Sequence, residues 1–430
     1  MECLQQSRSI ITFHEFHPMN SVRVQGHHAL FPAPAASALL SVVDAVVDAG
    51  LVVARFALAI APHAPVIRML SDPYNAAQHL HAMGRCVEMG ASVGFPILAI
   101  DAPRGLCRTT GVAAANCIRA DYTLALGTLS AGLFTADGRA MCGEIWFNDL
   151  GLSPSEEPCA FLNAPPALPA RPHNTHKGSF GDVAIIGGAA GMSGAALLAG
   201  TAALHGGAGR VFIGLLGLLG LSEAAHAALL SLQPELMVRQ PHELHELIVH
   251  HAITIVAGCG GGAGIAAHLP SILQNAHKLV LDADALNALA NNPLLQAALH
   301  NRPAGTTVLT PHPLEAARLM NISVAEVQSN RLNSAQMLAN RFACVVILKG
   351  SGSIIAAPNT LPRINPTGNA RLAAAGTGDV LAGLLGAYLA AGMDAQGAAC
   401  AAVFRHGEVA DHWNESCSST LTARELALRL

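Results

Sequence analysis

The sequence predicts an α/β protein whose C-terminal half is built on a mostly parallel sheet. Short apolar runs recur along that half, and segments of helical length rich in Ala and Leu separate most of them. The runs are continuously apolar rather than alternating, which indicates strands covered by helices on both faces. Of the 430 residues, 52% are hydrophobic and 12% are charged, a composition that suits extensive burial and excludes a disordered chain.

Seven apolar runs are predicted as strands of the C-terminal half. Helices between them include Gly194–Leu204 and Leu314–Leu319. In chain order, the predicted strands are Val183–Ile186, Val211–Ile213, Ile253–Val256, Leu279–Leu281, Thr307–Leu309, Val345–Leu348 and Ser353–Ala356.

The N-terminal region gives fewer strand signals. Pro96–Asp101 ends a buried strand and Glu144–Phe147 is a second candidate. Six prolines then lie between Gly151 and Pro172. Because proline at this density blocks both helix interiors and sheet ladders, we predict a linker over residues 151–173. It separates an N-terminal domain, residues 1–150, from a C-terminal domain, residues 174–430.

Charge, hydropathy and cysteine spacing exclude several classes of protein. The formal net charge of −4 gives no basic surface for nucleic acid. The longest apolar run, Val211–Leu221, is too short to span a bilayer, and Leu39–Ala61 has charged residues in its interior. The ten cysteines form no C-x-x-C pair, and the N-terminus lacks the features of a signal peptide. We therefore expect a soluble cytoplasmic protein.

Two motifs near the C-terminus predict an anion-binding site. Asn365–Asn369 reads NPTGN, and Ala375–Gly383 reads AGTGDVLAG. Small residues let backbone N–H groups approach a phosphate, and a helix that begins near Asp379 adds the positive end of its dipole. Asp379 is then well placed to take a proton from a substrate hydroxyl. The alternative for an aspartate here is a simple helix cap.

Three other strand ends carry polar residues. Lys349–Ser353 (KGSGS) is consistent with a hairpin that binds nucleotide phosphates. An ordinary hairpin turn without a ligand is an equally good interpretation. His312 follows the strand Thr307–Leu309, where parallel sheets usually contact ligands, although alone it also fits a loop residue. Asp282 and Asp284 could orient a magnesium ion or water, but capping of the next helix is the favoured interpretation.

Two glycine-rich strand ends, Gly187–Ala196 and Gly258–Gly262, have some features of a dinucleotide fingerprint. Neither reads G-x-G-x-x-G followed by an acid about 20 residues on. A hydride-transferring enzyme with a Rossmann fold is therefore disfavoured.

These motifs occur in a single order along the chain. HKGSFG, GxxGMSGAA, GCGGG, LDADALN, TPHPLE, KGSGS, NPTGNA and AGTGDVLAG follow one another between His176 and Gly383. From about Thr175 to its end, the sequence thereby resembles the ADP/ATP-dependent NAD(P)H-hydrate dehydratase family, a branch of the ribokinase-like fold. One departure is Leu314, which stands where the family usually has glycine and should disturb the turn only mildly.

The resemblance implies a three-layer domain and a repair reaction. NADH and NADPH hydrated on the reduced ring are returned to their normal form, with ADP or ATP and Mg²⁺ driving the loss of water. Asp379 is implied as the base on the ring hydroxyl, and the family is tetrameric, so we expect a homo-oligomer. Implied nucleotide contacts are Gly378, Lys349, Gly350, Ser351, Gly352 and Ser353, and implied hydrate contacts are Ala195, Gly262, His312 and Asp379.

The N-terminal domain resembles NAD(P)H-hydrate epimerase, which family members often carry in front, and it reads as a truncated Rossmann-like α/β domain. The matching segments are Ala99–Gly111 (AIDAPRGLCRTTG), Ala120–Thr123 and Cys142–Glu144. Within them, Asp101 remains as a remnant of the family's site.

Three departures from the epimerase family predict that this domain has lost its activity. The family's Asn-Asn-Gly-Gly-Asp loop is replaced by Ser71–Asn75, and the short stretch Gly84–Pro96 leaves no room for a family strand. Arg104 stands where the family has serine. The potassium ion that the resemblance implies would therefore lack its site.

Several alternatives stay open at the level of sequence. A ribokinase-like kinase of a small molecule, such as a hydroxymethylpyrimidine or a sugar, would share the anion site and the base, with a non-catalytic N-terminal module. The TPHPLE and NPTGNA strings favour the dehydratase. The sequence does not distinguish ADP from ATP, or NADH hydrate from NADPH hydrate.

Overall fold

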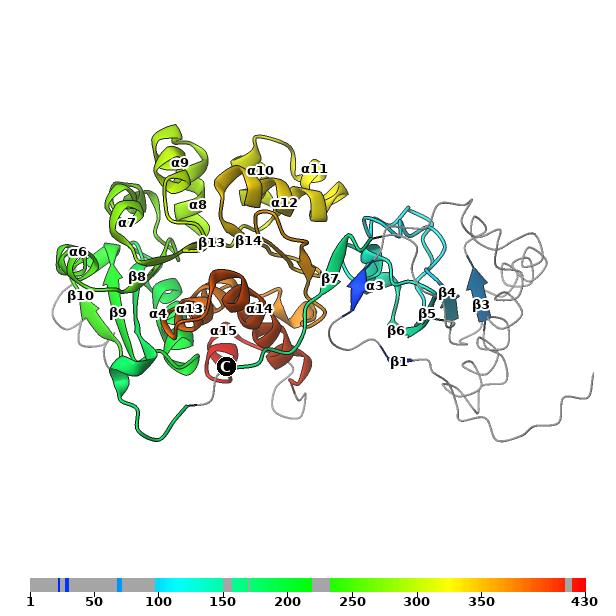
Figure 1. The fold of residues 1–430 in the computed structure, drawn as a ribbon, viewed down its shortest axis with the longest axis horizontal. Coiled ribbons are helices and arrows are strands. Elements are labelled where there is room, and N and C mark those ends of the chain that lie inside the picture. Colours follow the sequence, from blue (N-terminus) through cyan, green and yellow to red (C-terminus); the bar gives the residue numbers. More distant parts are fainter. Residues whose placement is uncertain are drawn as a thin grey trace, which may run out of the picture.

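The computed structural model describes eight stretches of the chain (Figure 1): residues 22–23, 28–30, 68–71, 97–149, 157–168, 171–218, 233–413 and 420–430. The apolar stretch Leu39–Ala61, most of Ser71–Asn75 and all of Gly84–Pro96 lie outside the described residues, so the predictions made for them stay predictions. In the stretches that are described, no helix is both long and apolar enough to cross a membrane.

The larger sheet is mostly parallel. Its strands are β2 (Ala29–Leu30), β7 (Ala160–Leu162), β8 (Asp182–Gly187), β9 (Arg210–Leu215), β10 (Met237–Arg239), β11 (Thr254–Ala257), β12 (Lys278–Leu281), β13 (Thr307–Leu309), β14 (Val345–Leu348), β15 (Ile354–Ala356) and β16 (Arg363–Ile364). They lie in the order β10-β9-β8-β11-β12-β13-β14-β15-β16-β7-β2. The pairs from β10 to β14 are all parallel, whereas β15 pairs antiparallel with both β14 and β16.

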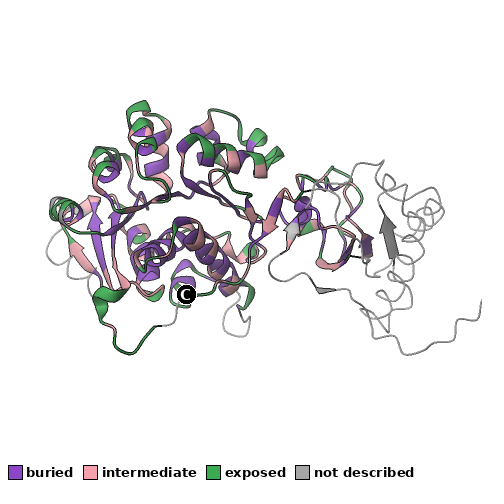
Figure 2. Ribbon diagram, viewed as in Figure 1, coloured by how far each residue is buried: buried purple, intermediate pink, exposed green. Residues whose placement is uncertain are grey.

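Helices cover both faces of this sheet, and its strands are buried between them (Figures 1 and 2). One face carries α4 (Ser193–His205), α13 (Thr377–Ala390), α14 (Ala395–Asp411) and α15 (Ala423–Ala427). The other carries α6 (Pro241–His250), α7 (Leu269–Asn275), α8 (Ala283–Ala290), α9 (Pro293–His300), α10 (Pro313–Met320), α11 (Val324–Ser329) and α12 (Arg331–Phe342). The predicted α/β class with a mostly parallel, helix-covered sheet is confirmed.

All seven strands predicted for the C-terminal half are present, each within one or two residues of its expected bounds. Their Val, Ile and Leu side chains are buried on both faces, which is why the apolar pattern is continuous. The short strands β10 and β16 are not predicted, because β10 has no buried residue and β16 spans only two residues.

A smaller sheet comes from the N-terminal region. Its strands are β1 (Val22–Arg23), β3 (Arg68–Ser71), β4 (Ile97–Ile100), β5 (Tyr122–Leu126) and β6 (Glu144–Asn148), in the order β1-β6-β5-β4-β3. The strands β3 to β6 are parallel, and β1 pairs antiparallel with β6. The sequence predicts β4 and β6 correctly but not β5, whose central residues are buried.

The proline-rich segment contains a strand, contrary to the expectation that proline would prevent sheet pairing. β7 pairs parallel with β16 and antiparallel with β2, and so extends the larger sheet toward the N-terminal region. Figure 1 shows β7 between the two halves of the molecule. The strand forms because its three residues lie between Pro158 and Pro165, where every backbone N–H is present.

The helices α4 and α13 cross closely on one face of the sheet. A side chain on Gly383, in the middle of α13, would collide with the backbone carbonyl of Ala199 in α4. Gly383, the last glycine of the AGTGDVLAG motif, is therefore required because the two helix backbones lie too close together for a side chain between them. This close crossing fixes the start of α13 over the carboxyl ends of the strands.

We expect Gly383→Ala to lower the thermal unfolding midpoint by several degrees, because overpacking typically costs about 1–3 kcal/mol. The matched control is Gly194→Ala in α4, where a Cβ would meet no atom within 4 Å. There the more helical alanine should leave the midpoint unchanged or raise it. Equal destabilisation by both substitutions would contradict the packing argument.

Candidate active site

The carboxyl ends of the parallel strands meet the start of α13 at one edge of the larger sheet. Glycine-rich turns follow β8 and β11, and backbone hydrogen bonds join them. The N–H of Gly188 donates to the carbonyl of Cys259 (2.9 Å), and that of Ala189 donates to Gly260 (2.7 Å). This edge is where open parallel sheets usually bind ligands.

Asp379 lies in the first turn of α13, close to this edge. The N-cap of the helix is Gly376, so Asp379 is not the capping residue. Burial, reinforced by the nearby carboxylate of Asp282, raises the pKa of Asp379 to about 6. A carboxyl group with a pKa near the working pH of an enzyme is well suited to accept a proton.

Asp282 follows β12 and forms an ion pair with Lys349, which follows β14. The Lys349 Nζ lies 2.7 Å from Asp282 Oδ1, and the hydroxyl of Thr310 donates to the same oxygen (2.6 Å). Asp282 stands at the N-cap of α8, but its side chain makes no capping bond. The favoured interpretation of Asp282 as a helix cap is therefore wrong.

Lys349 is the positive group at the centre of the site. Burial alone would lower the pKa of Lys349, but the carboxylates of Asp282 and Glu315 raise it above its ordinary value. A Cβ on Gly378 would lie 3.5 Å from the Lys349 Nζ, so this glycine leaves space beside the ammonium group. Two residues predicted to contact nucleotide are thus neighbours.

Cys259, Asp282 and Asp379 form a cluster whose potential ligand atoms lie within 4.8 Å of one another. Burial and the carboxylate of Asp379 raise the pKa of the Cys259 thiol well above its ordinary value, so the thiol stays protonated. The cluster therefore offers carboxylate oxygens rather than a thiolate. Oxygen donors of this kind suit Mg²⁺ better than zinc or copper.

His312 is the N-cap of α10. Its Nδ1 accepts hydrogen bonds from the N–H groups of Leu314 (3.1 Å) and Glu315 (3.3 Å), and its Nε2 lies 3.2 Å from the Glu315 carboxylate. Burial and Lys349 lower the pKa of His312, so the ring is neutral at pH 7. Leu314 occupies the first turn of the helix with a side chain that is 43% exposed, so the departure from glycine is accommodated.

Gly262 and Ala195 line neighbouring turns of the same edge. The N–H of Gly262 donates to the Asp284 carboxylate (2.8 Å). Ala195 lies against Gly260, where a Cβ would come within 2.8 Å of the Ala195 Cβ. The Asp284 side chain therefore binds the glycine-rich turn after β11. This contact differs from the helix-capping role that was predicted for Asp284.

The segments KGSGS and NPTGN are joined by a backbone hydrogen bond. The N–H of Asn365 donates to the carbonyl of Ser353 (2.8 Å), and the buried Asn365 side chain donates to Thr367. The N–H of Gly368 donates to the Asp411 carboxylate (2.7 Å). Since that N–H group is already paired, the NPTGN loop contributes less to an anion hole than its sequence predicts.

His406 is a buried residue that the sequence did not single out. Its Nε2 lies 2.8 Å from the carbonyl of Thr377, at the first residue of α13. Burial lowers the pKa of His406 to about 4, so the ring is neutral and its Nε2–H donates to that carbonyl. No local sequence signal marks this contact, because 29 residues separate the two partners.

Asp101 lies apart from this site, at the end of β4 in the smaller sheet. Its backbone φ is 65°, and its carboxylate accepts the N–H of Leu126 (3.0 Å). The guanidinium of the buried Arg108 lies 3.9 Å from the Asp101 carboxylate. Arg104, which stands where the epimerase family has serine, has an exposed side chain.

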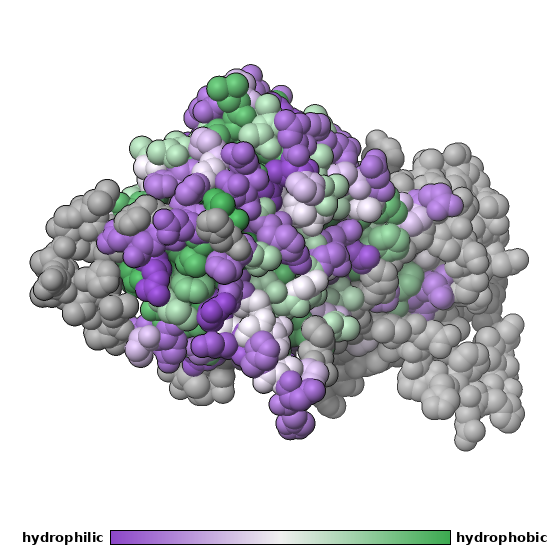
Figure 3. Space-filling view, turned by 60° about the vertical axis from the view of Figure 1, so that its left-hand side comes forward, coloured by the Kyte–Doolittle hydropathy of each residue, from purple (hydrophilic) through white to green (hydrophobic). Residues whose placement is uncertain are grey.

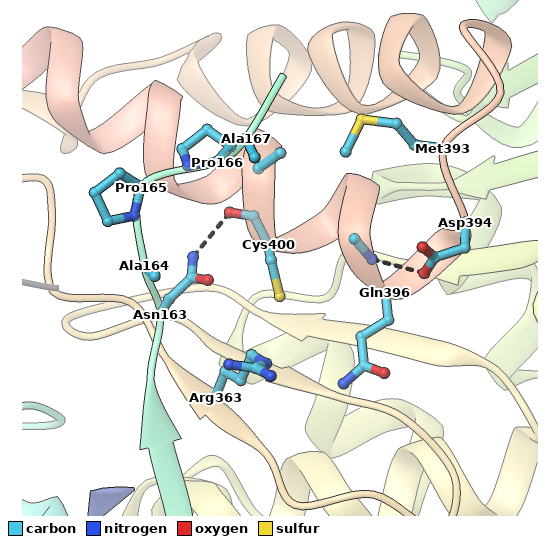
Figure 4. A pocket seen from close by; sticks show the side chains of 12 residues that line it. Asn163, Ala164, Pro165, Pro166, Ala167, Arg363, Met393, Asp394, Gln396 and Cys400 are labelled. Carbon is cyan, nitrogen blue, oxygen red and sulfur yellow. Dashed lines mark hydrogen bonds between the residues drawn. The ribbon is translucent and has the colours of Figure 1, made fainter. Parts of the chain in front are cut away.

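A cavity of about 390 Å³ lies at the other end of α13 (Figure 4). It is lined by the segment after β7, by Arg363, and by the start of α14, where Asp394 caps the Gly397 N–H (2.8 Å). Asp379 is the third residue of α13, and the rest of this helix, about 17 Å long, separates Asp379 from the cavity. On the face shown in Figure 3, hydrophilic and hydrophobic residues are interspersed among the described residues.

Comparison with known proteins identifies related sequences. The sequence profile of the NAD(P)H-hydrate dehydratase family matches residues 183–429, more than half of the chain. A bifunctional NAD(P)H-hydrate repair enzyme of Escherichia coli K12 is 39% identical over 349 residues, which are 77% of this chain and 63% of that enzyme. An ADP-dependent (S)-NAD(P)H-hydrate dehydratase of Neisseria meningitidis is 39% identical over 62% of this chain and 89% of its own length.

Solved structures agree with the sequence relatives. The ADP/ATP-dependent NAD(P)H-hydrate dehydratase of Bacillus subtilis, co-crystallised with ATP and Mg²⁺, is 31% identical with a TM-score of 0.52 and covers 60% of this chain and 91% of its own. A ribokinase-like protein of Enterococcus faecalis, 23% identical with a TM-score of 0.51 over 60% of this chain and 88% of its own, shares the fold. The chain covers less than two thirds of the length of the E. coli bifunctional relative. By its profile match and by these relatives, this chain belongs to the NAD(P)H-hydrate dehydratase family.

Proposed function

We propose that the C-terminal domain dehydrates the S form of NADH or NADPH hydrate and uses ADP or ATP to drive the reaction. The observation that carries the proposal is the group formed by Asp379, Lys349 and Asp282 at the carboxyl edge of the sheet. It combines a base with a raised pKa and a fixed ammonium group beside the glycine-rich start of a helix. Proton removal and phosphate binding need these two features together.

Asp379 acts as the base on the hydroxyl of the hydrated ring. The hydroxyl oxygen, losing its proton to Asp379, forms a bond to the terminal phosphorus of the nucleotide, and the shortened nucleotide leaves. The carbon–oxygen bond of the resulting phosphate ester then breaks, a proton leaves the adjacent ring carbon, and the double bond is restored. Phosphate leaves more readily than hydroxide, which is why the nucleotide is consumed.

Lys349, Gly378 and the hairpin residues Gly350, Ser351, Gly352 and Ser353 hold the nucleotide. The positive end of α13 and the Lys349 ammonium compensate the charge of the phosphates. Asp282 and one carboxylate oxygen of Asp379 would hold a Mg²⁺ ion, which would supply further positive charge on the phosphates, while the second oxygen of Asp379 accepts the proton. Ala195, Gly262 and His312 contact the hydrate, with the neutral His312 ring free of charge repulsion from Lys349.

The test is to incubate the full chain with NADH hydrate or NADPH hydrate and to follow recovery of the reduced nicotinamide absorbance. We expect recovery only with ADP or ATP present, and comparison of the two nucleotides shows the preference. Recovery without nucleotide contradicts the proposed mechanism. Phosphorylation of a small alcohol such as a hydroxymethylpyrimidine, with no action on the hydrates, would instead identify a kinase.

We further propose that the N-terminal domain does not epimerise the R and S hydrates. The buried Arg108 guanidinium lies beside Asp101, where the family's potassium site would need a free carboxylate, and its charge repels a cation. The replacement of the Asn-Asn-Gly-Gly-Asp loop by Ser71–Asn75 supports the same conclusion.

When pure R hydrate is supplied with ADP, we expect NADH to form no faster than the spontaneous conversion of R to S allows. The measurement is the rate of NADH recovery with and without an active epimerase added from another source. Addition should accelerate recovery. If this chain alone converts R hydrate faster than the spontaneous rate, the domain is active and the proposed loss is refuted.

A further inference from the structure

The N-terminal domain contacts the hairpin after β14 directly. The N–H of Ala136 donates to the carbonyl of Ser351 (3.2 Å), and the hydroxyl of Thr135 lies within reach of the carbonyls of Ser351 (3.4 Å) and Gly352 (3.3 Å). A side chain on Gly352 would collide with the backbone carbonyl of Phe134. The hairpin and the segment Phe134–Ala136 therefore meet backbone to backbone.

Thr135 also contacts Arg331, the first residue of α12. The Arg331 side chain is 1% exposed and donates to the Thr135 hydroxyl from Nε (3.2 Å). From Nη2 it donates to the carbonyls of Leu348 (3.2 Å) and Lys349 (3.1 Å). Burial lowers the pKa of Arg331 to about 10, so the group keeps its charge at neutral pH.

One guanidinium thus joins the end of β14, the hairpin and the N-terminal domain. The Thr135 hydroxyl oxygen accepts a hydrogen bond from Arg331, and the hydroxyl proton is donated to a carbonyl of the hairpin. The side chain of Arg331 and the hairpin backbone are thereby both held in place. Gly350 and Gly352 have φ values of 135° and 60°, so the hairpin backbone has a conformation that few residues other than glycine adopt. Gly350 and Ser351 are exposed, so the hairpin remains accessible to a ligand.

Two further contacts reach the neighbouring NPTGN loop. Arg139, from the N-terminal domain, donates to the carbonyl of Thr367 (3.0 Å). The buried Asn163, at the end of β7, donates to the side chain of Asn365 (3.0 Å) and to the carbonyl of Cys400 (2.8 Å). Residues before the C-terminal domain therefore hold both segments that the sequence associates with phosphate binding.

We propose that the N-terminal domain positions the nucleotide-binding hairpin of the dehydratase domain, and that Thr135 is the positioning residue. The proposal rests on the function proposed above, in which Lys349–Ser353 holds ADP or ATP. Thr135 touches no substrate and acts through the backbone of Ser351 and Gly352 and through Arg331. The N-terminal domain keeps this role whether or not it epimerises hydrates.

The experiment compares Thr135→Val and Thr135→Ser in the full chain. Valine keeps the shape but removes the hydroxyl, and the loss of a hydrogen bond of this kind corresponds to about a three- to tenfold weaker interaction. We expect Thr135→Val to raise the KM and the Kd for ADP or ATP by this factor, with kcat and the KM for the hydrate within twofold of wild type. Thr135→Ser, which keeps the hydroxyl, should restore the wild-type values.

The matched control is Thr123→Val. Thr123 is fully buried in β5 of the same domain and donates to the Cys142 carbonyl (2.7 Å), but it does not contact the hairpin. It should lower stability without changing the nucleotide KM. An unchanged nucleotide KM in Thr135→Val, or an equal rise in Thr123→Val, would overturn the proposal. Should Thr135→Val fail to fold, Arg139→Met tests the second contact with the same readout.

Calorimetric titration with ADP and with ATP, without hydrate, separates this proposal from the proposed function. If the wild-type chain binds nucleotide but does not dehydrate hydrates, the function is wrong, and weaker binding by Thr135→Val still supports the positioning role. If the wild type dehydrates hydrates and Thr135→Val binds nucleotide normally, only the positioning role is wrong. Absence of nucleotide binding by the wild type overturns both.

Discussion

Replacing Asp379 with asparagine is expected to lower kcat for hydrate dehydration by about 100- to 10,000-fold, the usual cost of removing a general base. Asparagine keeps the size of the side chain but cannot accept the proton of the ring hydroxyl. The Kd for ADP or ATP should change little, since Lys349, the hairpin and one side-chain oxygen at position 379 remain. Steady-state kinetics and calorimetric titration measure the two quantities separately.

The matched control is Asp394→Asn at the start of α14. Asp394 caps that helix through Gly397 and lies beyond the far end of α13, which extends about 17 Å from Asp379, and asparagine caps equally well. Its kcat should equal that of the wild type. A near-normal kcat for Asp379→Asn would show that this carboxylate serves only the helix, and the mechanism would then need another base.

The raised pKa of Asp379 predicts how rate and stability depend on pH. The wild-type kcat/KM should rise as the pH increases through about 6, because the carboxylate must be ionised to accept a proton. The fold disfavours the charged form, so stability is highest below the ordinary pKa of 3.8 and is lost as the pH rises through 6. At pH 8 the free energy of unfolding of Asp379→Asn should therefore exceed that of the wild type by up to about 3 kcal/mol, and its unfolding temperature should be higher. At pH 4 the two proteins should unfold at similar temperatures.

Lys349→Met is expected to destabilise the C-terminal domain by about 3–5 kcal/mol, the typical cost of leaving one member of a buried ion pair alone. Asp282 is 2% exposed, and without the ammonium group only the Thr310 hydroxyl would remain on its Oδ1. The pKa of Asp379 should also rise further, because Lys349 lowers it in the wild type. Thermal unfolding and the pH dependence of any remaining activity measure the two effects.

The double variant Lys349→Met with Asp282→Asn removes both charges of the ion pair, and so tests whether the unpaired Asp282 carboxylate causes the destabilisation. It should recover most of the lost stability, because no buried carboxylate is left without a partner, yet it should not recover activity. Lys278→Met provides a second control, since the Lys278 Nζ donates only to the carbonyls of Leu389 and Met393. Its effect on stability should be clearly smaller than that of Lys349→Met, and equal effects would contradict the argument from the buried pair.

The fold of the C-terminal half could be predicted from the sequence because its strands are fully buried. Strands such as Val345–Leu348 have no exposed face, so they appear in the sequence as continuous apolar runs. Such a run can be recognised without knowing which strands it pairs with. Most of the strands that were missed have two to four residues, whereas β5, with five, was missed although its central residues are buried. The pairing of β7 with β16 and with β2 joins strands about 200 and 130 residues apart, which a local pattern does not record.

The candidate site was only partly predictable for a related reason. Asp379 and Lys349 lie in motifs whose glycines mark a phosphate site, whereas Asp282 occupies a position that is both a strand end and a helix N-cap. Which of the two roles its side chain takes depends on Lys349, 67 residues further along the chain. The contact of Thr135 with the hairpin spans 216 residues and has no sequence signal at all.

The addition of β7 to the larger sheet has a consequence for the order of events during synthesis. β7 leaves the ribosome about 200 residues before β16, its parallel partner. At typical rates of about 5–20 residues per second, it waits on the order of 10–40 s with one edge unpaired. An exposed strand edge is a site for pairing with another chain, so the nascent protein passes through a period of vulnerability to aggregation that ends only when Arg363 and Ile364 emerge.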